Sequence, residues 1–322
     1  MIMSNLRYLI VNFGGPRSKE EIAPFLKELL CDRDVVATPL PDFLHRFFFS
    51  RVAKRRAIKI ASDYDFIGGK SPIFEDTEAI AQAVRHRLKA PVLTFHRYLP
   101  ATHAASLKAI RELSCDELRV FPMFPQFSYA TTGSIARFFA EHLPKKVVEK
   151  MRWVKSYATH PAYVAAMQKR IGDCLKENQL EGRGTLLFFS AHGLPQKFVD
   201  RGDIYERECQ ESYAQIRAAF PECSHLLAYQ SKFGRGEWIR PYTNEVCEQL
   251  EGPENVIFVP LSFTSDHIET LFEIEKQYLP ILKNKGLNAL RCPALNREEM
   301  WIDTIATIIQ GDQLVSNKLL RK

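Results

Sequence analysis

Short apolar runs alternate with amphipathic stretches along this chain, and this alternation constrains its fold more than any other feature. The apolar runs predict strands near residues 7–12, 91–96, 118–123, 152–155, 184–190, 225–230 and 255–260. Helical periodicity predicts helices near 19–30, 75–88, 102–113, 132–142, 161–176, 205–219, 243–250, 268–282 and 298–309. Strands that alternate with helices in this way are typical of βαβ units. We therefore expect an α/β fold with parallel sheets covered by helices on both faces.

The length of the chain and an internal repeat predict two domains. A chain of 322 residues is long for one hydrophobic core, and two domains of roughly 150 residues each are more usual. Residues 9–16 (LIVNFGGP) resemble residues 188–195 (FFSAHGLP), and residues 124–128 resemble residues 259–263. The two pairs differ in spacing, so we expect extra chain in the first half, within residues 33–74.

The segment 33–74 joins phenylalanines to a run of basic residues, although the net charge of the whole chain is only +6. The basic residues are Arg51, Lys54, Arg55, Arg56 and Lys59, and they follow Phe43, Leu44, Phe47, Phe48 and Phe49. A helix of this composition suits an anionic membrane surface or the lip of an apolar pocket for an acidic ligand. A solvated helix packed on its own domain and a contact with nucleic acid are the other interpretations.

The cysteines and the amino terminus favour a reducing cytoplasm. Seven cysteines are scattered along the chain without a C-x-x-C pair, so neither a zinc ribbon nor a redox dithiol is indicated. No signal peptide precedes the first predicted strand. The longest uncharged run, 120–136, contains prolines and a glycine, so we expect no membrane-spanning helix.

Two histidine motifs lie where predicted strands end. His192 follows one buried run, and His267 and Glu269 follow another just before an amphipathic helix. Ligand sites of parallel sheets lie beyond the carboxyl ends of the strands. If these two strands are neighbours, His192, His267 and Glu269 share one cleft, where they can bind a metal ion or transfer protons.

Glu273 extends the second motif, because it lies four residues after Glu269 and on the same face of the predicted helix. Two carboxylates stacked in this way are a candidate path for a divalent cation or for protons. A purely structural interpretation is a capping box, in which Asp266 is the N-cap and Glu269 occupies the third helical position.

Several enzyme classes lose their usual sequence support. The chain has no H-E-x-x-H, G-x-S-x-G, P-loop or G-x-G-x-x-G motif. Metalloprotease, hydrolase, phosphoryl-transfer and dinucleotide-dependent redox chemistry are therefore not indicated. What remains is a cleft with histidines, carboxylates, aromatic rings and cations, but no ligand set for a permanently bound metal.

An ordered series of motifs resembles the ferrochelatase family over residues 8 to about 296. The motifs are NFGGP at 12–16, IGGKSP at 67–72, RY at 97–98, FPQFSYATTGS at 124–134, FSAHGLP at 189–195, QSKFG at 230–234 with Trp238, and SDHIETL at 265–271. The resemblance implies two Rossmann-like domains of the chelatase type, with parallel sheets and an active-site cleft between them. It implies a first domain over 1–156 with a lip near 33–74, a second over 157–290, and a C-terminal helical segment over 291–322 that packs back on the first.

The resemblance also implies an activity and a set of site residues. The activity is the insertion of Fe²⁺, as a substrate, into protoporphyrin IX in the last step of haem synthesis. His192, Glu269 and His267 would be catalytic, and His192, Glu269 and Glu273 would contact the metal. The implied porphyrin-binding residues are Phe13, Arg55, Arg56, Tyr64, Ser71, Arg97, Tyr98, Trp238 and Phe263. An aromatic pocket with cations at its rim suits a flat apolar disc that carries two carboxylates.

Two departures from the family pattern bear on cofactors and partners. Some members hold an iron–sulfur cluster through a cysteine in the FPQFS motif and three in a C-terminal tail, but here Tyr129 takes the first position and no cysteine follows Cys292. We therefore expect no cluster and no permanently bound cofactor, and a monomer. We expect a cytoplasmic protein with possible peripheral contact with the inner membrane surface, and no nucleic-acid partner.

Four other functions remain open from the sequence. One is a coproporphyrin ferrochelatase, and another is a chelatase that inserts cobalt or nickel into a more acidic tetrapyrrole. The third is a haem- or metal-binding protein of the same fold without turnover, and the last is a dinucleotide-dependent oxidoreductase, which lacks a glycine fingerprint.

Overall fold

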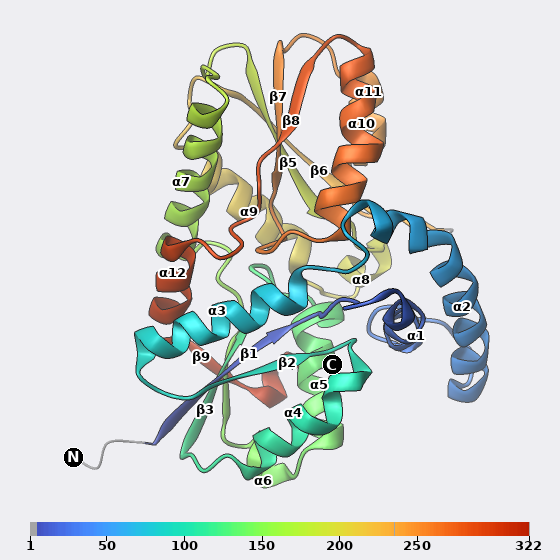
Figure 1. Cartoon of the computed structure of the whole chain (residues 1–322), viewed down its shortest axis with the longest axis vertical. Coiled ribbons are helices and arrows are strands. Elements are labelled where there is room, and N and C mark those ends of the chain that lie inside the picture. The colour runs from blue at the N-terminus through green and yellow to red at the C-terminus, as the bar shows by residue number, and fades with distance from the viewer. Residues whose placement is uncertain (1–4, 235, 322) are drawn as a thin grey trace. The chain divides into compact units, whose positions relative to one another are not determined.

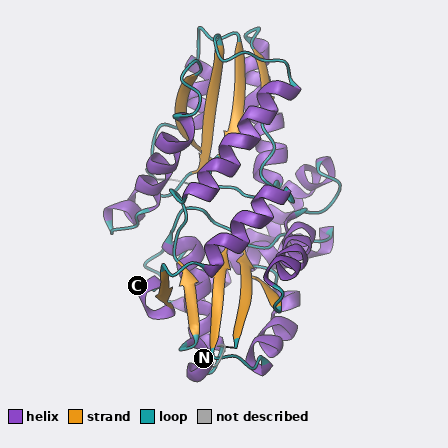
Figure 2. Cartoon of the chain, turned by 90° about the vertical axis from the view of Figure 1, so that its left-hand side faces the viewer, coloured by secondary structure: helices purple, strands orange, loops and turns teal. Residues whose placement is uncertain are grey.

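A computed structural model describes residues 5–234 and 236–321 of the chain (Figure 1). The chain divides into two compact units. One is built from the chain up to Ser156 together with the segment from Ile305 onward, and the other is Tyr157–Thr304. In each unit, helices flank a sheet, as Figure 2 shows. The predicted α/β class with parallel sheets is confirmed.

The sheet of the first unit has five strands in the order β2-β1-β3-β4-β9. The strands are β1 (Leu6–Asn12), β2 (Val92–His96), β3 (Glu117–Pro122), β4 (Met151–Val154) and β9 (Leu314–Ser316). The first four are parallel, and β9 runs antiparallel to β4 at one edge. Leu9, Ile10 and Val11 of the central strand are fully buried, as a strand covered on both faces requires.

The helices of the first unit follow the predicted ranges, apart from the long insertion and short turns that carry little periodicity. They are α1 (Ile22–Cys31), α2 (Asp42–Phe66), α3 (Ile73–Leu88), α4 (Pro100–Glu112), α5 (Ser134–His142) and α6 (Lys145–Val148). Short 3₁₀ turns occupy η1 (Lys19–Glu21) and η4 (Asn317–Leu320), and a π-helical turn, η2 (Tyr129–Gly133), leads into α5.

The extra chain of the first half is mainly the 25-residue helix α2. The helix begins after Pro41 and ends before Gly68 and Gly69, which have φ values of +92° and +80°. Glycine adopts this left-handed backbone without steric cost, so the pair stops the helix. Helix α2 packs against α1, and only His45, Ala53, Ala57 and Tyr64 of its residues are buried.

The second unit has a fully parallel sheet in the order β6-β5-β7-β8. Its strands are β5 (Thr185–His192), β6 (Ser224–Gln230), β7 (Asn255–Pro260) and β8 (Asn288–Arg291). Its helices are α7 (Pro161–Glu177), α8 (Gln196–Asp200), α9 (Tyr205–Arg217), α10 (Thr243–Gln249), the π-helical segment η3 (Glu269–Tyr278) and α11 (Leu279–Asn284). Helix α12 (Glu299–Gln310) begins in this unit and continues into the first.

The internal repeat of the sequence has a structural counterpart. Both sheets place their first four strands in the order second, first, third, fourth. Segment 124–128 follows the third strand of its sheet, and segment 259–263 spans the end of the third strand of the other; a π-helical stretch comes after each. The repeated motifs therefore occupy the carboxyl ends of equivalent strands, where parallel sheets place their ligand sites.

Residues 291–304 belong with the second unit, although the sequence grouped them with the C-terminal segment. The side chains explain this placement. Glu298 pairs with Arg170 at 2.8 Å, and the ring of Trp301 lies 5.8 Å from that of Tyr157 and 6.2 Å from that of Tyr163. Among the described residues, no helix combines the length and hydropathy needed to cross a membrane.

Candidate active site

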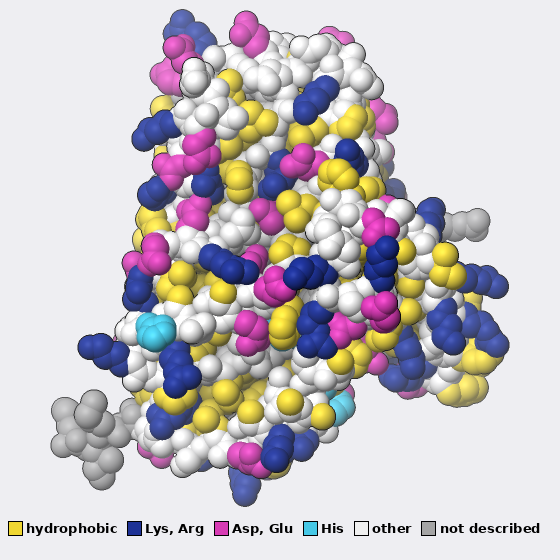
Figure 3. Space-filling model, in the orientation of Figure 1, with side chains coloured by type: hydrophobic (Ala, Val, Ile, Leu, Met, Phe, Trp, Pro, Cys, Tyr) yellow, Lys and Arg dark blue, Asp and Glu magenta, His cyan; other side chains and the backbone are white. Residues whose placement is uncertain are grey.

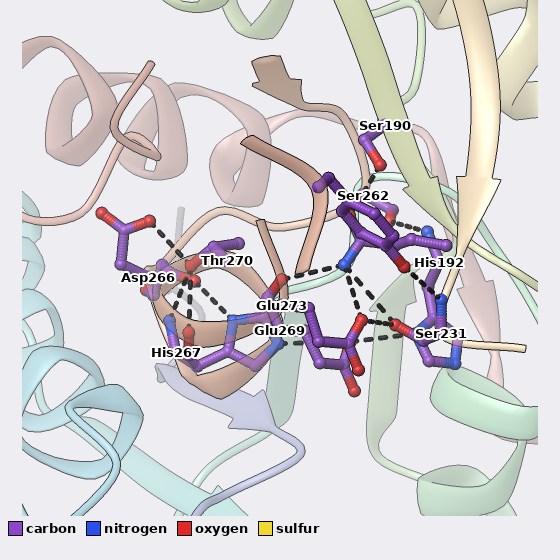
Figure 4. A network of polar contacts seen from close by, with 12 residues as sticks. Ser190, His192, Ser231, Ser262, Asp266, His267, Glu269, Thr270 and Glu273 are labelled. Atoms are coloured by element: carbon purple, nitrogen blue, oxygen red, sulfur yellow. Dashed lines mark hydrogen bonds and ion pairs between the residues drawn. The ribbon is translucent and has the colours of Figure 1, made fainter. Parts of the chain in front are cut away.

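His192 and Glu269 form an ion pair at the carboxyl end of the second sheet (Figure 4). His192 is the last residue of β5, and Glu269 is the first residue of the π-helical segment η3, which follows β7. Because β5 and β7 are neighbours, their carboxyl ends bring the two side chains together. The imidazole Nδ1 lies 2.9 Å from Glu269 Oε2, so Nε2 is the ring nitrogen that Glu269 leaves open. About a third of the His192 side chain is exposed.

His267 lies on the other side of the same carboxylate. Its Nε2 is 3.4 Å from Glu269 Oε2, and its Nδ1 is 3.2 Å from the carbonyl oxygen of Ser265. The main-chain N–H of His267 donates to the Thr270 hydroxyl at 2.9 Å. The structure therefore brings together the three residues that the two sequence motifs predicted to share a site.

The capping-box interpretation of Asp266 and Glu269 is wrong. The Glu269 carboxylate reaches His192, and the main-chain N–H of Asp266 donates instead to Asn296 Oδ1 at 2.8 Å. The Asp266 carboxylate accepts hydrogen bonds from Thr270 Oγ1 at 2.9 Å and from Arg291 Nη1 at 2.7 Å. Asp266 thus fixes the loop that carries His267, while the Glu269 carboxylate contacts His192 and His267.

Glu273 lies one turn beyond Glu269 and is held by Gln230, the last residue of β6, and by Ser231, which follows it. The Ser231 hydroxyl donates to Glu273 Oε2 at 2.5 Å, and the Gln230 amide donates to the same oxygen at 3.1 Å. Gln230 also donates to the Glu269 carbonyl oxygen at 2.8 Å and accepts from the Ser190 hydroxyl at 2.6 Å. These contacts tie the π-helical segment to strands β5 and β6.

The sequence analysis did not assign Gln230, Ser231 or Ser190 to the site. Gln230 and Ser231 stand in the QSKFG motif, which was a usable signal, and Ser190 stands two residues before His192. Side chains that alternate along a strand point to the same face, so Ser190 and His192 share a face of the sheet. Ser231 has φ of +64°, an uncommon value for a residue other than glycine.

The charges of this cluster shift one another's pKa values. Burial disfavours the charged imidazolium, but the charge and hydrogen bond of Glu269 outweigh burial and raise the pKa of His192. Burial also favours a neutral Glu269, yet the charge and hydrogen bond of His192 hold the pKa of that carboxyl far below its usual range. Burial and the nearby charge of Glu269 raise the pKa of Glu273 to about 7. A strong proton acceptor and a carboxyl that titrates near neutral pH therefore lie side by side.

Aromatic side chains border the polar cluster. The Phe263 ring lies 6.2 Å from the His192 ring and 4.7 Å from the His267 ring. The buried Trp238 packs beside Gly193, where an added Cβ would meet the indole at 3.0 Å and the Gln230 carbonyl oxygen at 2.8 Å. Glycine is required at this position because only a residue without a side chain leaves room for Trp238.

The first unit contains the other predicted site residues. Asp32 binds two of them, Arg97 and Tyr98, and Tyr98 in turn contacts a third, Phe13. The fully buried Asp32 carboxylate accepts hydrogen bonds from Arg97 Nη2 at 2.8 Å and Tyr98 Oη at 2.9 Å. Arg137 pairs with its other oxygen at 2.9 Å. The Tyr98 ring packs edge-on against Phe13 at 4.5 Å. Arg97 and Tyr98 therefore lie behind Phe13 in the interior of the unit.

The remaining four predicted residues differ in exposure. Arg55 and Arg56 are exposed on α2, whereas Tyr64, on the last turn of that helix, is buried. Ser71 is buried, and its main-chain N–H donates to the Pro16 carbonyl oxygen at 2.7 Å. The motifs at 12–16 and 67–72 therefore contact each other within the first unit, where an added Cβ on Gly15 would meet Ser71 at 2.5 Å.

The ionisable side chains of the polar cluster can transfer protons and contact a cation. Within residues 5–234 and 236–321, no group of three or more His, Cys, Asp or Glu side chains is arranged to hold a metal ion. An open imidazole, an ionised carboxylate and a carboxyl that titrates near pH 7 can accept protons and guide a cation. A reaction that exchanges protons for a metal ion needs both properties.

Comparisons with known proteins agree with this chemistry. The ferrochelatase family model matches residues 8–313. A ferrochelatase of Chlamydia abortus is 45% identical over 98% of this chain and 98% of its own length, and one of Chlamydia trachomatis serovar A is 45% identical over 94% and 95%. Among solved structures, SirB from Bacillus subtilis with Fe³⁺ has a TM-score of 0.57 at 11% identity, covering 95% of this chain and 94% of that one.

A second structural neighbour is CbiX, described as the terminal enzyme for biosynthesis of siroheme in denitrifying bacteria. It has a TM-score of 0.53 at 14% identity and covers 94% of this chain and 98% of its own. At such low identity the two structures support the chelatase fold alone. The sequence matches carry the assignment further, and the chain belongs to the ferrochelatase family of lyases, metal chelatases that insert iron into porphyrin in haem biosynthesis.

Proposed function

We propose that the chain inserts Fe²⁺ into protoporphyrin IX, releases two pyrrole protons and forms protohaem. The ion pair between His192 and Glu269 is the observation that carries the proposal. Metal entry displaces two protons from the macrocycle, so a base must face the pyrrole nitrogens. His192 is placed for this role because its Nδ1 is held by Glu269 and its Nε2 is left open.

Glu269 assists by stabilising the imidazolium that forms when His192 accepts a proton. The opposite charges lie 2.9 Å apart and favour the protonated ring. Glu273, whose pKa is about 7, can take the proton onward or meet the incoming Fe²⁺. His267, in contact with Glu269, completes the polar cluster. In this proposal His192, Glu269 and Glu273 are the residues that meet the metal substrate.

We propose that Phe13, Trp238 and Phe263 supply aromatic contacts to the porphyrin, and that Tyr64 and Ser71 also contribute to porphyrin binding. The family resemblance and the positions of these residues beside the two strand-end motifs support the assignment. Arg55 and Arg56, exposed on α2, suit the porphyrin carboxylates. The contacts of Arg97 and Tyr98 with Asp32 favour an indirect role for both, in which they hold the Phe13 ring.

We propose that α2 also contacts an anionic membrane surface from the cytoplasmic side. Phe43, Phe47 and Phe48 are 70%, 59% and 54% exposed, and Figure 3 shows basic and hydrophobic side chains gathered over this helix. Exposed aromatic rings next to cations match the interface of an acidic bilayer. Phe49 does not belong to this surface, because it is half-buried and its ring packs 4.6 Å from that of His45.

We further propose that the protein acts as a monomer without an iron–sulfur cluster or another permanent cofactor, and without a nucleic-acid partner. The support is Tyr129 at the position of the first cluster ligand and the lack of any cysteine after Cys292.

The decisive experiment is an anaerobic assay of Fe²⁺ insertion into protoporphyrin, coproporphyrin and sirohydrochlorin. We expect the highest kcat/KM with protoporphyrin, and we expect His192→Ala to lose turnover while it still binds porphyrin, measured by the change in porphyrin absorbance. His86→Ala, at an exposed histidine of α3, is the control. Equal turnover in wild type and His192→Ala would remove the assigned role of His192. Porphyrin binding without any insertion by the wild type would favour a carrier protein.

A further inference from the structure

The main-chain N–H and C=O groups of His192 have no partner in strand β7. Strand β7 pairs with β5 only as far as Pro260, and the last ladder bond runs from the Leu261 N–H to the Ser190 carbonyl oxygen at 2.9 Å. Backbone groups of alternate residues face the same neighbouring strand. The backbone groups of Ser190 face β7, and the N–H of Gly193 faces β6, where it donates to the Gln230 carbonyl oxygen. The N–H and C=O of His192 therefore face the β7 side of the sheet, beyond the point where β7 ends.

Two side-chain hydroxyls make the hydrogen bonds that β7 does not make with His192. The His192 N–H donates to Ser262 Oγ at 2.8 Å, and the Tyr205 hydroxyl donates to the His192 carbonyl oxygen at 2.9 Å. The carbonyl of Leu261, the next acceptor along β7, is occupied by the Tyr163 hydroxyl at 3.1 Å. Both backbone groups of His192 are therefore satisfied by side chains that no sequence motif assigned to the site.

Tyr205 is itself firmly held. It is buried, it is the first residue of α9, and its main-chain N–H donates to Asp203 Oδ1 at 3.0 Å. A buried side chain with an anchored backbone has little freedom to move, so the Tyr205 hydroxyl couples the position of α9 to the end of β5.

We propose that Tyr205 and Ser262 are positioning residues for the reaction, and that they fix the His192 backbone so that the imidazole can pair with Glu269 and present Nε2 to the porphyrin. The inference rests on the proposed role of His192. Without these hydroxyls the last residue of β5 has no anchor toward β7, and a ring displaced by about 1 Å can cost up to a hundredfold in rate.

The test uses the full chain and compares Tyr205→Phe and Ser262→Ala with wild type in the anaerobic Fe²⁺ and protoporphyrin assay. We expect kcat to fall roughly tenfold or more in each variant, with the KM for protoporphyrin unchanged, because the hydroxyls act through His192 and not on the porphyrin. Ser262→Thr keeps the hydroxyl and is expected to recover most of kcat.

Tyr229→Phe is the matched control. Tyr229 is a buried tyrosine of the same sheet, and its hydroxyl has no hydrogen-bond partner among the residues that the structure describes. Loss of a purely structural hydroxyl lowers thermal stability without changing kcat per folded molecule, so Tm and the folded fraction are measured for every variant. If Tyr205→Phe fails to fold, Ser262→Ala and its threonine rescue decide the question.

The outcomes separate the inference from the proposed function. Normal kcat in both Tyr205→Phe and Ser262→Ala, with an inactive His192→Ala, would overturn the positioning roles and leave the role of His192 intact. Normal kcat in His192→Ala would overturn the proposed function itself. An equal loss of kcat in Tyr229→Phe would also count against the inference, because it would indicate a general effect of the buried tyrosines.

Discussion

Replacing Glu269 by glutamine removes the charge that stabilises protonated His192 but keeps the size of the side chain. Two unit charges about 4 Å apart attract each other by about 4 kcal/mol at an effective dielectric constant of about 20. The two side chains are 35% and 27% exposed, and solvent weakens the attraction. A value of about 1.5–3 kcal/mol, typical of hydrogen bonds to charged groups, is then reasonable. Because about 1.4 kcal/mol corresponds to a factor of ten in rate, we expect kcat to fall roughly ten- to a hundredfold.

The assay is anaerobic Fe²⁺ insertion into protoporphyrin under saturating substrate, with kcat and both KM values measured. Glu275→Gln is the control, because Glu275 stands on the same π-helical segment but pairs with Arg291 at 3.1 Å instead of His192. A kcat for Glu269→Gln within twofold of the wild-type value would refute the argument, since the charge of Glu269 would then contribute nothing to the transition state.

Three further predictions concern stability and membrane contact. Asp32→Asn leaves buried Arg97 without its counter-charge and is expected to lower the free energy of unfolding by about 3–5 kcal/mol, measured by urea denaturation. Replacing Phe43, Phe47 and Phe48 by serine is expected to weaken binding to vesicles that contain anionic lipid, measured by co-sedimentation. Burial raises the pKa of Glu273 from 4.5 to about 7, so its contribution to stability is complete below pH 4.5 and is lost as the pH rises through 7. Glu273→Gln should therefore flatten the fall in Tm across this pH range.

Each of these predictions has a control and an outcome that contradicts it. Asp173→Asn, at an exposed helical ion pair, should change the free energy of unfolding by less than about 0.5 kcal/mol, and an equally small change for Asp32→Asn would count against the buried network. Phe49→Ser should leave vesicle binding unchanged, and full binding by the triple variant would point to a packing role for α2. A Tm profile of Glu273→Gln identical to that of the wild type would mean that another group causes the pH dependence.

Much of the fold could be predicted because the apolar runs are strong and regular. The strands that end at Asn12, His192 and Pro260 are rich in buried aliphatic and aromatic residues, so their positions stand out in the sequence. Strands β8 and β9 were missed because they have only four and three residues, too few to give a regular pattern. The 25-residue length of α2 was also not defined, since its apolar and basic residues do not form one regular stripe.

Some residues of the site could likewise be predicted from the sequence, and others could not. His192, His267 and Glu269 could be brought together from sequence because strand ends of one parallel sheet converge. The residues that hold them in place could not be found by this argument, because Ser262, Tyr205 and Gln230 act through side-chain hydrogen bonds to other parts of the chain. Asp32 was missed for the same reason, since its partners Arg97 and Arg137 lie 65 and 105 residues away in the chain. Such long-range polar contacts leave no periodic signal in the sequence.

The three-residue strand β9 has a consequence for synthesis of the protein on the ribosome. It pairs Leu314 with Val154 and so covers the edge of β4, the last strand of the first unit to be made before the second unit begins. About 160 residues must be translated between the two strands, which takes roughly 8–32 s at the usual rates of elongation. During this interval the edge of β4 offers unpaired backbone groups to other nascent chains. The edge of β4 is thus open to incorrect strand pairing from the synthesis of Val154 until Leu314 has been made and can pair with it.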